Sequence, residues 1–571
     1  MAVTNEIVTC KIHPAIGIAR VGNSPDKFFV GPEVPDLCEP PRGGYKDAGA
    51  ARKGMPPRVK RQAARFRIFG YDREGRAVRE LTAREATIAW TVHLANKKAE
   101  WLEFLGGDGE HGLPKAPRRN RTIKDRQTLI IDPGPRTITG PGQSAEFTGG
   151  KFMDITVPLG EIRTEKDGRL LVLGGFGQSG TSDPKQLITH YANNDRWFDD
   201  VSDGPVTAKV TLADGRQLPV APSWVIVGPP DYSPPTRHFI TLYDIAIEAA
   251  INRGFMQPRT RPSFTHDIYP VFARTLDLQW VQAVALMGHG PGAGESANFA
   301  SSLKALASNG PEHADFRHSI FDRLRDPNAT GSKARNQANG AFMPLLSGDE
   351  GDKVSGKPST WFSLTKTRYE MMRRWAEGEF EADWKGEPPP ARKVTPEGLD
   401  RAALENCSGG PFFPGIEASW NMRNAAVYSE PFRFDHQQLL PGDVTKRSAL
   451  PWQADFFECR EHWWPAQRPD EVLTLANYER LAQLDQELAK LDPKSARFKS
   501  LKAQRDELWL ERAPWARGLP EESPAGDNAM ATDWHRLGFL VNQNRDGSAL
   551  RLNGQTQVVE TERDESLGSE A

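Results

Sequence analysis

The sequence has few cysteines, no long apolar run and no excess of either charge. Its 571 residues include four cysteines and no Cys-x-x-Cys pair, so we expect neither a disulfide scaffold nor a zinc or other metal site. Lysine plus arginine number 73 and aspartate plus glutamate number 75, which gives no overall attraction to nucleic acid or to an anionic membrane. No apolar stretch approaches the ~20 residues of a membrane-spanning helix.

The start of the chain also lacks the features of a secretory signal. Residues 1–11 have neither the basic end nor the apolar stretch that such a signal needs, so we expect the protein to be cytoplasmic as made. The mean hydropathy of −0.58 is low for a globular protein. However, 15 tryptophans and 27 phenylalanines are enough to build a core, which excludes a disordered chain.

The pattern of short apolar runs predicts a large, multi-domain α+β chain with three regions. Residues 1–240 are predicted to be β-rich, residues 241–396 mainly helical with a linker, and residues 397–571 to contain further helices. Predicted strands include 128–132, 169–174 and 206–212, and predicted helices include 242–251, 269–287 and 359–378. Residues 40–62 are rich in Pro, Gly, Lys and Arg, and we expect a long surface loop there.

Residues 470–512 carry the pattern of a helical hairpin. Leu481, Leu484, Leu488 and Leu491 repeat at intervals of three and four residues before Asp492-Pro493 interrupts the pattern. A second apolar pattern then follows, which predicts a second helix packed on the first. We expect this arm to serve in packing or as an oligomer contact rather than in catalysis, and we expect a homo-oligomer.

The segment Gly175-Phe-Gly-Gln-Ser-Gly180 matches the G-x-G-x-x-G pattern of dinucleotide-binding loops. In such folds the loop opens a helix whose N-terminus holds the pyrophosphate. Here the loop runs into Thr181-Ser-Asp-Pro184, which is typical of a turn rather than of a helix. The pattern therefore favours a glycine turn between strands over a site for flavin or nicotinamide.

An acid precedes a cysteine by four residues in Asp455-Phe-Phe-Glu-Cys459, and Trp534 follows much later in the chain. Taken singly, a cysteine is most often a small buried hydrophobe and a tryptophan is most often core. In a helix, Asp455 and Cys459 would share one face. A carboxylate beside a thiol raises the thiol pKa, which disfavours a thiolate nucleophile and favours an acid that acts as a base.

The segment from Ile12 to Phe29, IHPAIGIARVGNSPDKFF, resembles the N-terminus of the LodA-like amino acid oxidases. Further segments that resemble this family, in the same order along the chain, are 171–175, 193–206, 228–232, 263–268, 409–417, 455–459 and 534. The resemblance covers about residues 10 to 540. No single motif is decisive, but so many in one order are specific.

The resemblance implies a cysteine tryptophylquinone cofactor made in the C-terminal region from Cys459 and Trp534. It also implies that Asp455 is needed to form the cofactor and takes a proton from the substrate. Cys407 matches a family cysteine near the site. His535 and Tyr191 are further candidates for site neighbours, although each residue type is more often structural.

The implied reaction is oxidation of a primary amine of an amino acid, either the lysine ε-amine or an α-amine such as that of glycine. The partners would be a small amino acid and O₂, and a separate flavoprotein that helps to oxygenate the tryptophan. Family members occur both in the cytoplasm and exported, so export without a classical signal peptide stays open. The alternatives are a flavin or nicotinamide oxidoreductase built on Gly175–Gly180, or a non-enzymatic relative that binds through the 470–512 arm.

Overall fold

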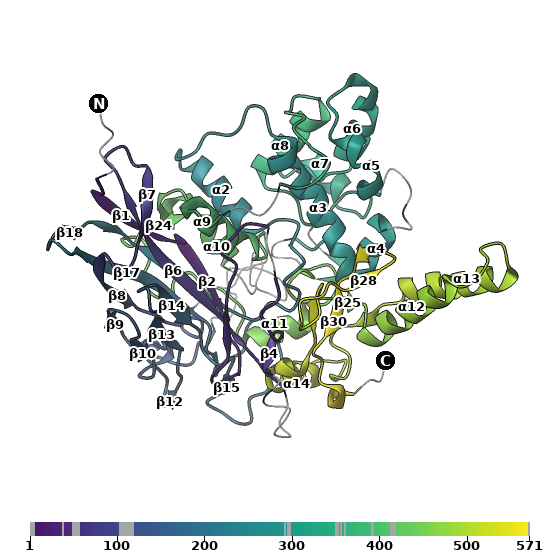
Figure 1. Ribbon diagram of the computed structural model, residues 1–571. Coiled ribbons are helices and arrows are strands. Elements are labelled where there is room, and N and C mark those ends of the chain that lie inside the picture. Colours follow the sequence, from purple (N-terminus) through teal and green to yellow (C-terminus); the bar gives the residue numbers. More distant parts are fainter. Residues whose placement is uncertain are drawn as a thin grey trace.

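The N-terminal part of the chain forms one large sheet that nearly closes into a barrel (Figure 1). The computed structural model describes residues 6–568 apart from 37–38, 48, 50–56, 102–118, 291–292, 294–297, 349–352, 355–356, 359–360, 390–392 and 411–417. In spatial order the main strands are β10 (Ser144–Glu146), β13 (Glu161–Thr164), β14 (Leu170–Leu173), β6 (Arg61–Tyr71), β2 (Ile16–Arg20), β20 (Ser223–Gly228), β17 (Ser202–Leu212), β8 (Ala86–Val92) and β9 (Arg136–Thr139). The first and last of these strands, β10 and β9, lie close together.

Side-chain alternation along the strands builds the interior of this sheet. In β8 the buried residues are Ala86, Ile88, Trp90 and Val92, while the intervening side chains are more exposed, as expected for a strand with one face on a core. Every residue of β14 and of β20 is buried, so these central strands are covered on both faces. The sequence predictions for residues 169–174 and 206–212 are confirmed, but residues 128–132 form the end of a 3-10 turn and a single bridge instead of a strand.

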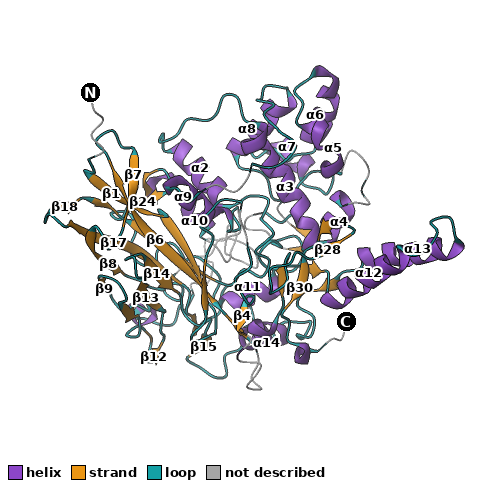
Figure 2. Ribbon diagram, in the orientation of Figure 1, coloured by secondary structure: helices purple, strands orange, loops and turns teal. Residues whose placement is uncertain are grey.

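Helices occupy the middle and C-terminal parts of the chain and lie to one side of the sheet (Figures 1 and 2). Their bounds are α2 (Leu242–Asn252), α3 (Tyr269–Asp277), α4 (Ala283–His289), α5 (Phe299–Leu306), α6 (Ala314–Phe321), α7 (Gly331–Gln337), α8 (Lys366–Ala376), α9 (Pro396–Glu405), α10 (Ser419–Met422), α11 (Trp452–Glu458), α12 (Leu475–Leu488), α13 (Ala496–Leu510) and α14 (Ala525–Asp533). The fold is therefore α+β, with a β-rich N-terminal part and helical middle and C-terminal parts, as the sequence predicts. No helix in the described part of the chain combines the length and apolarity that a membrane span requires.

One predicted helix is interrupted, because a tertiary contact competes with its backbone hydrogen bonds. Residues 269–287 form α3, a short 3-10 turn and then α4, not a single helix. At the break, the carbonyl of Val281 accepts a hydrogen bond from the Asp470 amide, and the Glu471 carboxylate accepts one from the Ala283 amide. The predicted helix at 359–378 begins only at Lys366, where the Thr365 side chain caps it by accepting from the Arg368 amide.

The segment predicted to be a helical hairpin contains α12 and α13, which pack on each other and project from the body of the molecule (Figure 1). Leu481 and Leu484 are buried, whereas no residue of α13 is. Arg505 of α13, which interrupts the apolar pattern, pairs with Asp485 of α12 at 2.9 Å. An ion pair therefore takes the place of an apolar contact between the two helices.

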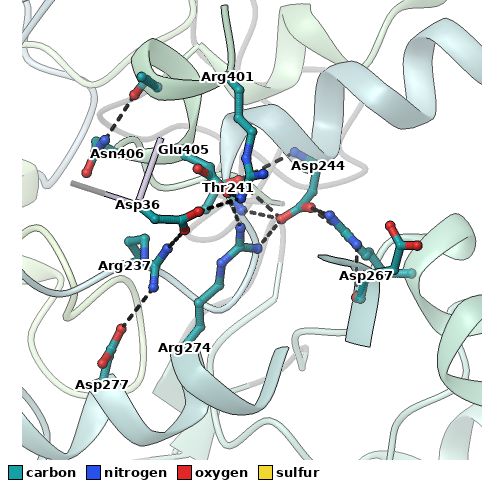
Figure 3. A network of polar contacts seen from close by, with 12 residues as sticks. Asp36, Arg237, Thr241, Asp244, Asp267, Arg274, Asp277, Arg401, Glu405 and Asn406 are labelled. Atoms are coloured by element: carbon teal, nitrogen blue, oxygen red, sulfur yellow. Dashed lines mark hydrogen bonds and ion pairs between the residues drawn. The ribbon is translucent and has the colours of Figure 1, made fainter. Parts of the chain in front are cut away.

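A network of ion pairs, largely buried, joins several helices to one another and to Asp36 in the N-terminal region (Figure 3). Asp244 of α2 pairs with Arg274 of α3 at 2.6 Å and with Arg368 of α8 at 2.7 Å. The network continues through Glu405 of α9 to Arg401 and then Asp36. Although burial opposes ionisation, the two arginines lower the pKa of Asp244, so this carboxylate stays ionised in the interior.

Replacing Asp244 with Asn should lower the stability of the protein substantially, because Arg274 and Arg368 would lose a buried counter-charge. Loss of one partner of such a buried pair typically costs about 3–5 kcal/mol. In the wild type this stabilisation is present above the ordinary carboxyl pKa near 3.8 and is lost as pH falls below it. Thermal unfolding at pH 7 measures the change. The control Asp214→Asn removes an exposed partner of Arg216, and an equal effect of both variants would contradict the prediction.

Candidate active site

Helices α11 and α14 approach each other closely because Gly526 has no side chain. A Cβ atom on Gly526 would lie 1.8 Å from the ring of Phe457, so any larger residue would push the helices apart. Phe457 belongs to α11, and α14 runs directly into the short turn η6 (Trp534–Arg536). The packing therefore fixes the position of Trp534 relative to α11.

One face of α11 carries Trp452 and Asp455, three residues apart, and Cys459, four residues further on, is the C-cap that ends the helix. The ring of Trp452 packs edge-on against that of Trp534, with centroids 5.4 Å apart and planes at 69°. The Cys459 thiol donates a hydrogen bond to Asp455 Oδ1 at 2.7 Å. The segment that contains Asp455 is thus helical, and Trp452 of the same helix contacts Trp534.

Buried polar groups hold both ends of α11. At its N-terminus, Asp199 Oδ2 accepts a hydrogen bond from the Trp452 amide at 3.0 Å and also pairs with the fully buried Lys98. Near its C-terminus, Arg468 Nε donates to the Phe456 carbonyl at 2.6 Å. The motif at 193–206 thereby orients the helix that presents Asp455.

The electrostatics of Asp455 and Cys459 favour proton transfer over nucleophilic attack. Burial raises the pKa of Asp455 to about 7, against the smaller opposing effects of the Cys459 hydrogen bond and of Lys98 and Arg468. Burial and the adjacent carboxylate raise the pKa of the Cys459 thiol well above its ordinary value. Asp455 Oδ2 accepts no hydrogen bond from the described residues, so it is available to a proton donor.

Trp534 lines an open pocket of about 680 Å³. Its indole is almost fully buried, at 3% exposure, and Tyr232 donates a hydrogen bond to its carbonyl at 2.7 Å. Gly177, at φ +71°, packs directly on the ring: a Cβ atom there would lie 2.2 Å from Cζ2 and 2.7 Å from Cη2 of Trp534. The Gly177 carbonyl accepts from Gln453 of α11 at 3.1 Å, which joins this loop to the helix.

The glycine-rich loop 175–180 connects β14 to the strand β15 (Ser179–Thr181), and no helix follows it. The glycine-turn interpretation is therefore correct, and the helix that a dinucleotide site requires is missing from these described residues. Asp200 holds the loop by accepting a hydrogen bond from the Gln178 amide at 3.0 Å. The sequence prediction missed the contact between Gly177 and Trp534, for which the only signal was the glycine pattern itself.

The three candidate neighbours lie in different places. His535 lines the same pocket as Trp534, and burial lowers the pKa of its imidazole. Tyr191 stacks on His190 with centroids 4.6 Å apart and does not line this pocket. Cys407 is buried beside Arg20, whose guanidinium lies 3.4 Å from the sulfur, and it lines a separate pocket of about 330 Å³.

Two family models match the chain. Residues 13–227 match the model described as L-Lysine epsilon oxidase N-terminal, and residues 344–478 match the L-lysine epsilon oxidase C-terminal domain. Together they span more than half of the chain. The chain belongs to the LodA-like amino acid oxidase family.

A curated relative and several solved structures agree with this assignment. The L-lysine 6-oxidase of Marinomonas mediterranea is 29% identical over 545 residues, which cover 78% of this chain and 70% of that protein. The crystal structure of the L-Lys epsilon-oxidase from the same organism, and that of its Schiff base intermediate with L-Lys, each align with a TM-score of 0.72 at 24% identity. They cover 97% of this chain and 95% of theirs, and these structural matches establish the fold.

Replacing Asp455 with Asn in protein whose Trp534 is unmodified should change how stability depends on pH. Because the folded-state pKa of about 7 lies above the ordinary 3.8, the wild type loses stability as pH rises between these values, by roughly 4 kcal/mol at most. The variant has no carboxylate to ionise at this position. The melting temperature of the variant minus that of the wild type should therefore increase from pH 5 to pH 8. The exposed control Asp546→Asn should show no such trend, and a constant difference for Asp455→Asn would refute the pKa shift.

Proposed function

We propose that this amino acid oxidase carries a cysteine tryptophylquinone formed from Cys459 and Trp534 and uses it to deaminate a primary amine of an amino acid. Family membership supports the reaction class. The observation that carries the assignment of residues is the hydrogen bond between Cys459 and Asp455, at the end of the helix whose Trp452 packs against Trp534.

The residues present fit this group. Cys459 offers a protonated thiol beside the Asp455 carboxylate, which can take its proton. Because residue 177 is glycine, it places no side chain against the Cζ2–Cη2 edge of Trp534. When formed, the quinone would supply an electrophilic carbonyl for the substrate amine and accept two electrons from it. Family membership supports the further proposal that a separate flavoprotein assists oxygenation of Trp534.

In turnover, Asp455 would hold and release the substrate proton. A base whose pKa lies near 7 is protonated and deprotonated with little cost at neutral pH, which is the optimum for general base catalysis. Its Oδ2 accepts no hydrogen bond within the described part of the chain. Tyr232 fixes the backbone of Trp534, and the burial of the indole limits the access of water to its ring.

The overall reaction is R–CH₂–NH₂ + O₂ + H₂O → R–CHO + NH₃ + H₂O₂. The substrate loses two electrons and two protons, one proton from the carbon and one from the amine nitrogen, and O₂ receives them. An α-amine would give an oxo acid in place of the aldehyde. The name of the relative, L-lysine 6-oxidase, makes the ε-amine of L-lysine the first substrate to test, followed by the α-amine of glycine.

Peptide mass mapping of protein produced together with its flavoprotein should find the peptides of Cys459 and Trp534 joined. The joined pair should lack two hydrogens for the thioether, and should carry two added oxygens with loss of two more hydrogens for the quinone. Purified protein should consume O₂ and release H₂O₂ with L-lysine or glycine. Unmodified Trp534 under these conditions would refute the proposal, and Asp455→Ala should leave the cofactor unfinished.

Replacing Gly177 with Ala should block cofactor formation, because its Cβ would overlap Trp534 and displace the ring from Cys459. Since displacement by about 1 Å can reduce a rate ~100-fold, we expect the yield of joined peptide to fall at least ~10-fold. Gly142→Ala is the matched control, because Gly142 has a similar φ of +69° but nothing within 4 Å of a Cβ. Equal yields from the two variants would show that the contact with Trp534 has no role.

A further inference from the structure

Among its described lining residues, the pocket that Trp534 lines contains positive charge and no negative charge. Its lining residues, all within the described part of the chain, include Arg58, His535 and the polar residues Gln178 and Ser179, but no aspartate or glutamate. Its volume of about 680 Å³ lies in the range of ~300–1,000 Å³ that is typical for pockets of small molecules. The pocket is therefore suited to a ligand that carries a negative group.

Arg58 provides the full positive charge of this pocket. It belongs to β5 (Arg58–Val59), which pairs with β4 (Lys46–Asp47). These strands lie within residues 40–62, so the ends of the predicted surface loop are paired, whereas residues 48 and 50–56 lie outside the described residues. Asp47 is the cross-strand neighbour of Arg58, but its carboxylate accepts from the Gly49 amide at 2.9 Å. No described residue forms an ion pair with Arg58.

The N-terminal family motif fixes the strand that carries Arg58. Asn23 Oδ1 accepts a hydrogen bond from the Val59 amide at 2.7 Å, and the Ser24 amide donates to the Val59 carbonyl at 2.8 Å. A Cβ on Gly22 would lie 2.7 Å from the Lys60 backbone, so only glycine allows this close approach. β5 also packs against η6, the turn that begins with Trp534. Arg58 is therefore held at a defined position beside the ring.

A second polar group in the pocket wall has no hydrogen-bond partner among the residues that the structure describes. Ser179 Oγ is buried and makes no hydrogen bond with the described residues, although a buried hydroxyl is normally bonded. It follows Gln178, whose backbone amide is held by Asp200. Among the described residues, a hydroxyl without a hydrogen bond and an arginine without an ion pair thus line one pocket, and a carboxylate could satisfy both.

We infer that Arg58 binds the carboxylate of the amino acid substrate, while its amine faces Trp534. This inference rests on the proposed function and names the residue that would restrict the substrate to amines with a carboxylate. A guanidinium binds a carboxylate through two parallel hydrogen bonds, which fixes orientation as well as position. An amine without the carboxylate would leave Arg58 without an ion pair and would bind in no fixed orientation.

The test compares L-lysine with 1,5-diaminopentane, which keeps the amine and the carbon chain but lacks the carboxylate. In Arg58→Gln, kcat/KM for L-lysine, normalised to the joined Cys459–Trp534 peptide, should fall about 10- to 100-fold, as for loss of a charged hydrogen bond. The value for diaminopentane should change less than about threefold. Arg58→Lys should recover part of the loss. The control Arg73→Gln, whose side chain is 77% exposed, should leave both values unchanged.

A binding measurement makes the test independent of cofactor formation. Titration calorimetry of hexanoate, which has the carboxylate and chain without the amine, should show weaker binding to Arg58→Gln than to wild type in protein with unmodified Trp534. Equal losses for both amines, or unchanged hexanoate binding, would overturn the role of Arg58 while leaving the proposed function intact. A joined peptide with no oxidation of either amine or of glycine would overturn both.

Discussion

The close contact between α11 and α14 determines the geometry around Trp534. Gly526 against Phe457 sets the distance between the two helices, and each helix carries one half of the proposed cofactor at or just beyond its C-terminal end. The residues that hold α11 in place, Asp199 and Arg468, are buried and bonded to its backbone. Because protein interiors are close-packed, a larger residue at Gly526 would shift α14 and with it the indole ring of Trp534.

The β-rich N-terminal part and the helical part make separate contributions to the same site. The helical part supplies Asp455, Cys459 and Trp534. The β-rich N-terminal part supplies the glycine loop against the ring and, through the separate β4–β5 pair, Arg58. The buried ion pairs around Asp244 join α2, α3 and α8 (Figure 3). These helices are separate in sequence from the glycine loop and from α11 and α14. The ion pairs stabilise the helical part without any group that faces the pocket that Trp534 lines.

Local pattern predicted those features that depend on neighbours in sequence. The four-residue spacing predicted that Asp455 and Cys459 would lie together if the segment were helical, and it is helical up to Glu458. The leucine repeat at 481–491 predicted a helix, and α12 extends to Leu488. The contacts of Gly177 with Trp534 and of Asn23 with Val59 join segments far apart in the chain. No periodicity within these segments indicates which distant residue each one contacts. The sequence therefore showed the glycine pattern and the N-terminal motif but not the contacts that they make.

The projecting arm formed by α12 and α13 lies in the segment between Cys459 and Trp534. A thioether between these residues would close the whole segment, arm included, into a covalent ring. By the chain-entropy argument, closing a loop of this length removes about 4 kcal/mol of freedom from the unfolded chain. Maturation would then do more than create a reactive group: it would lock the C-terminal region against unfolding, so the active form would also be the more durable one.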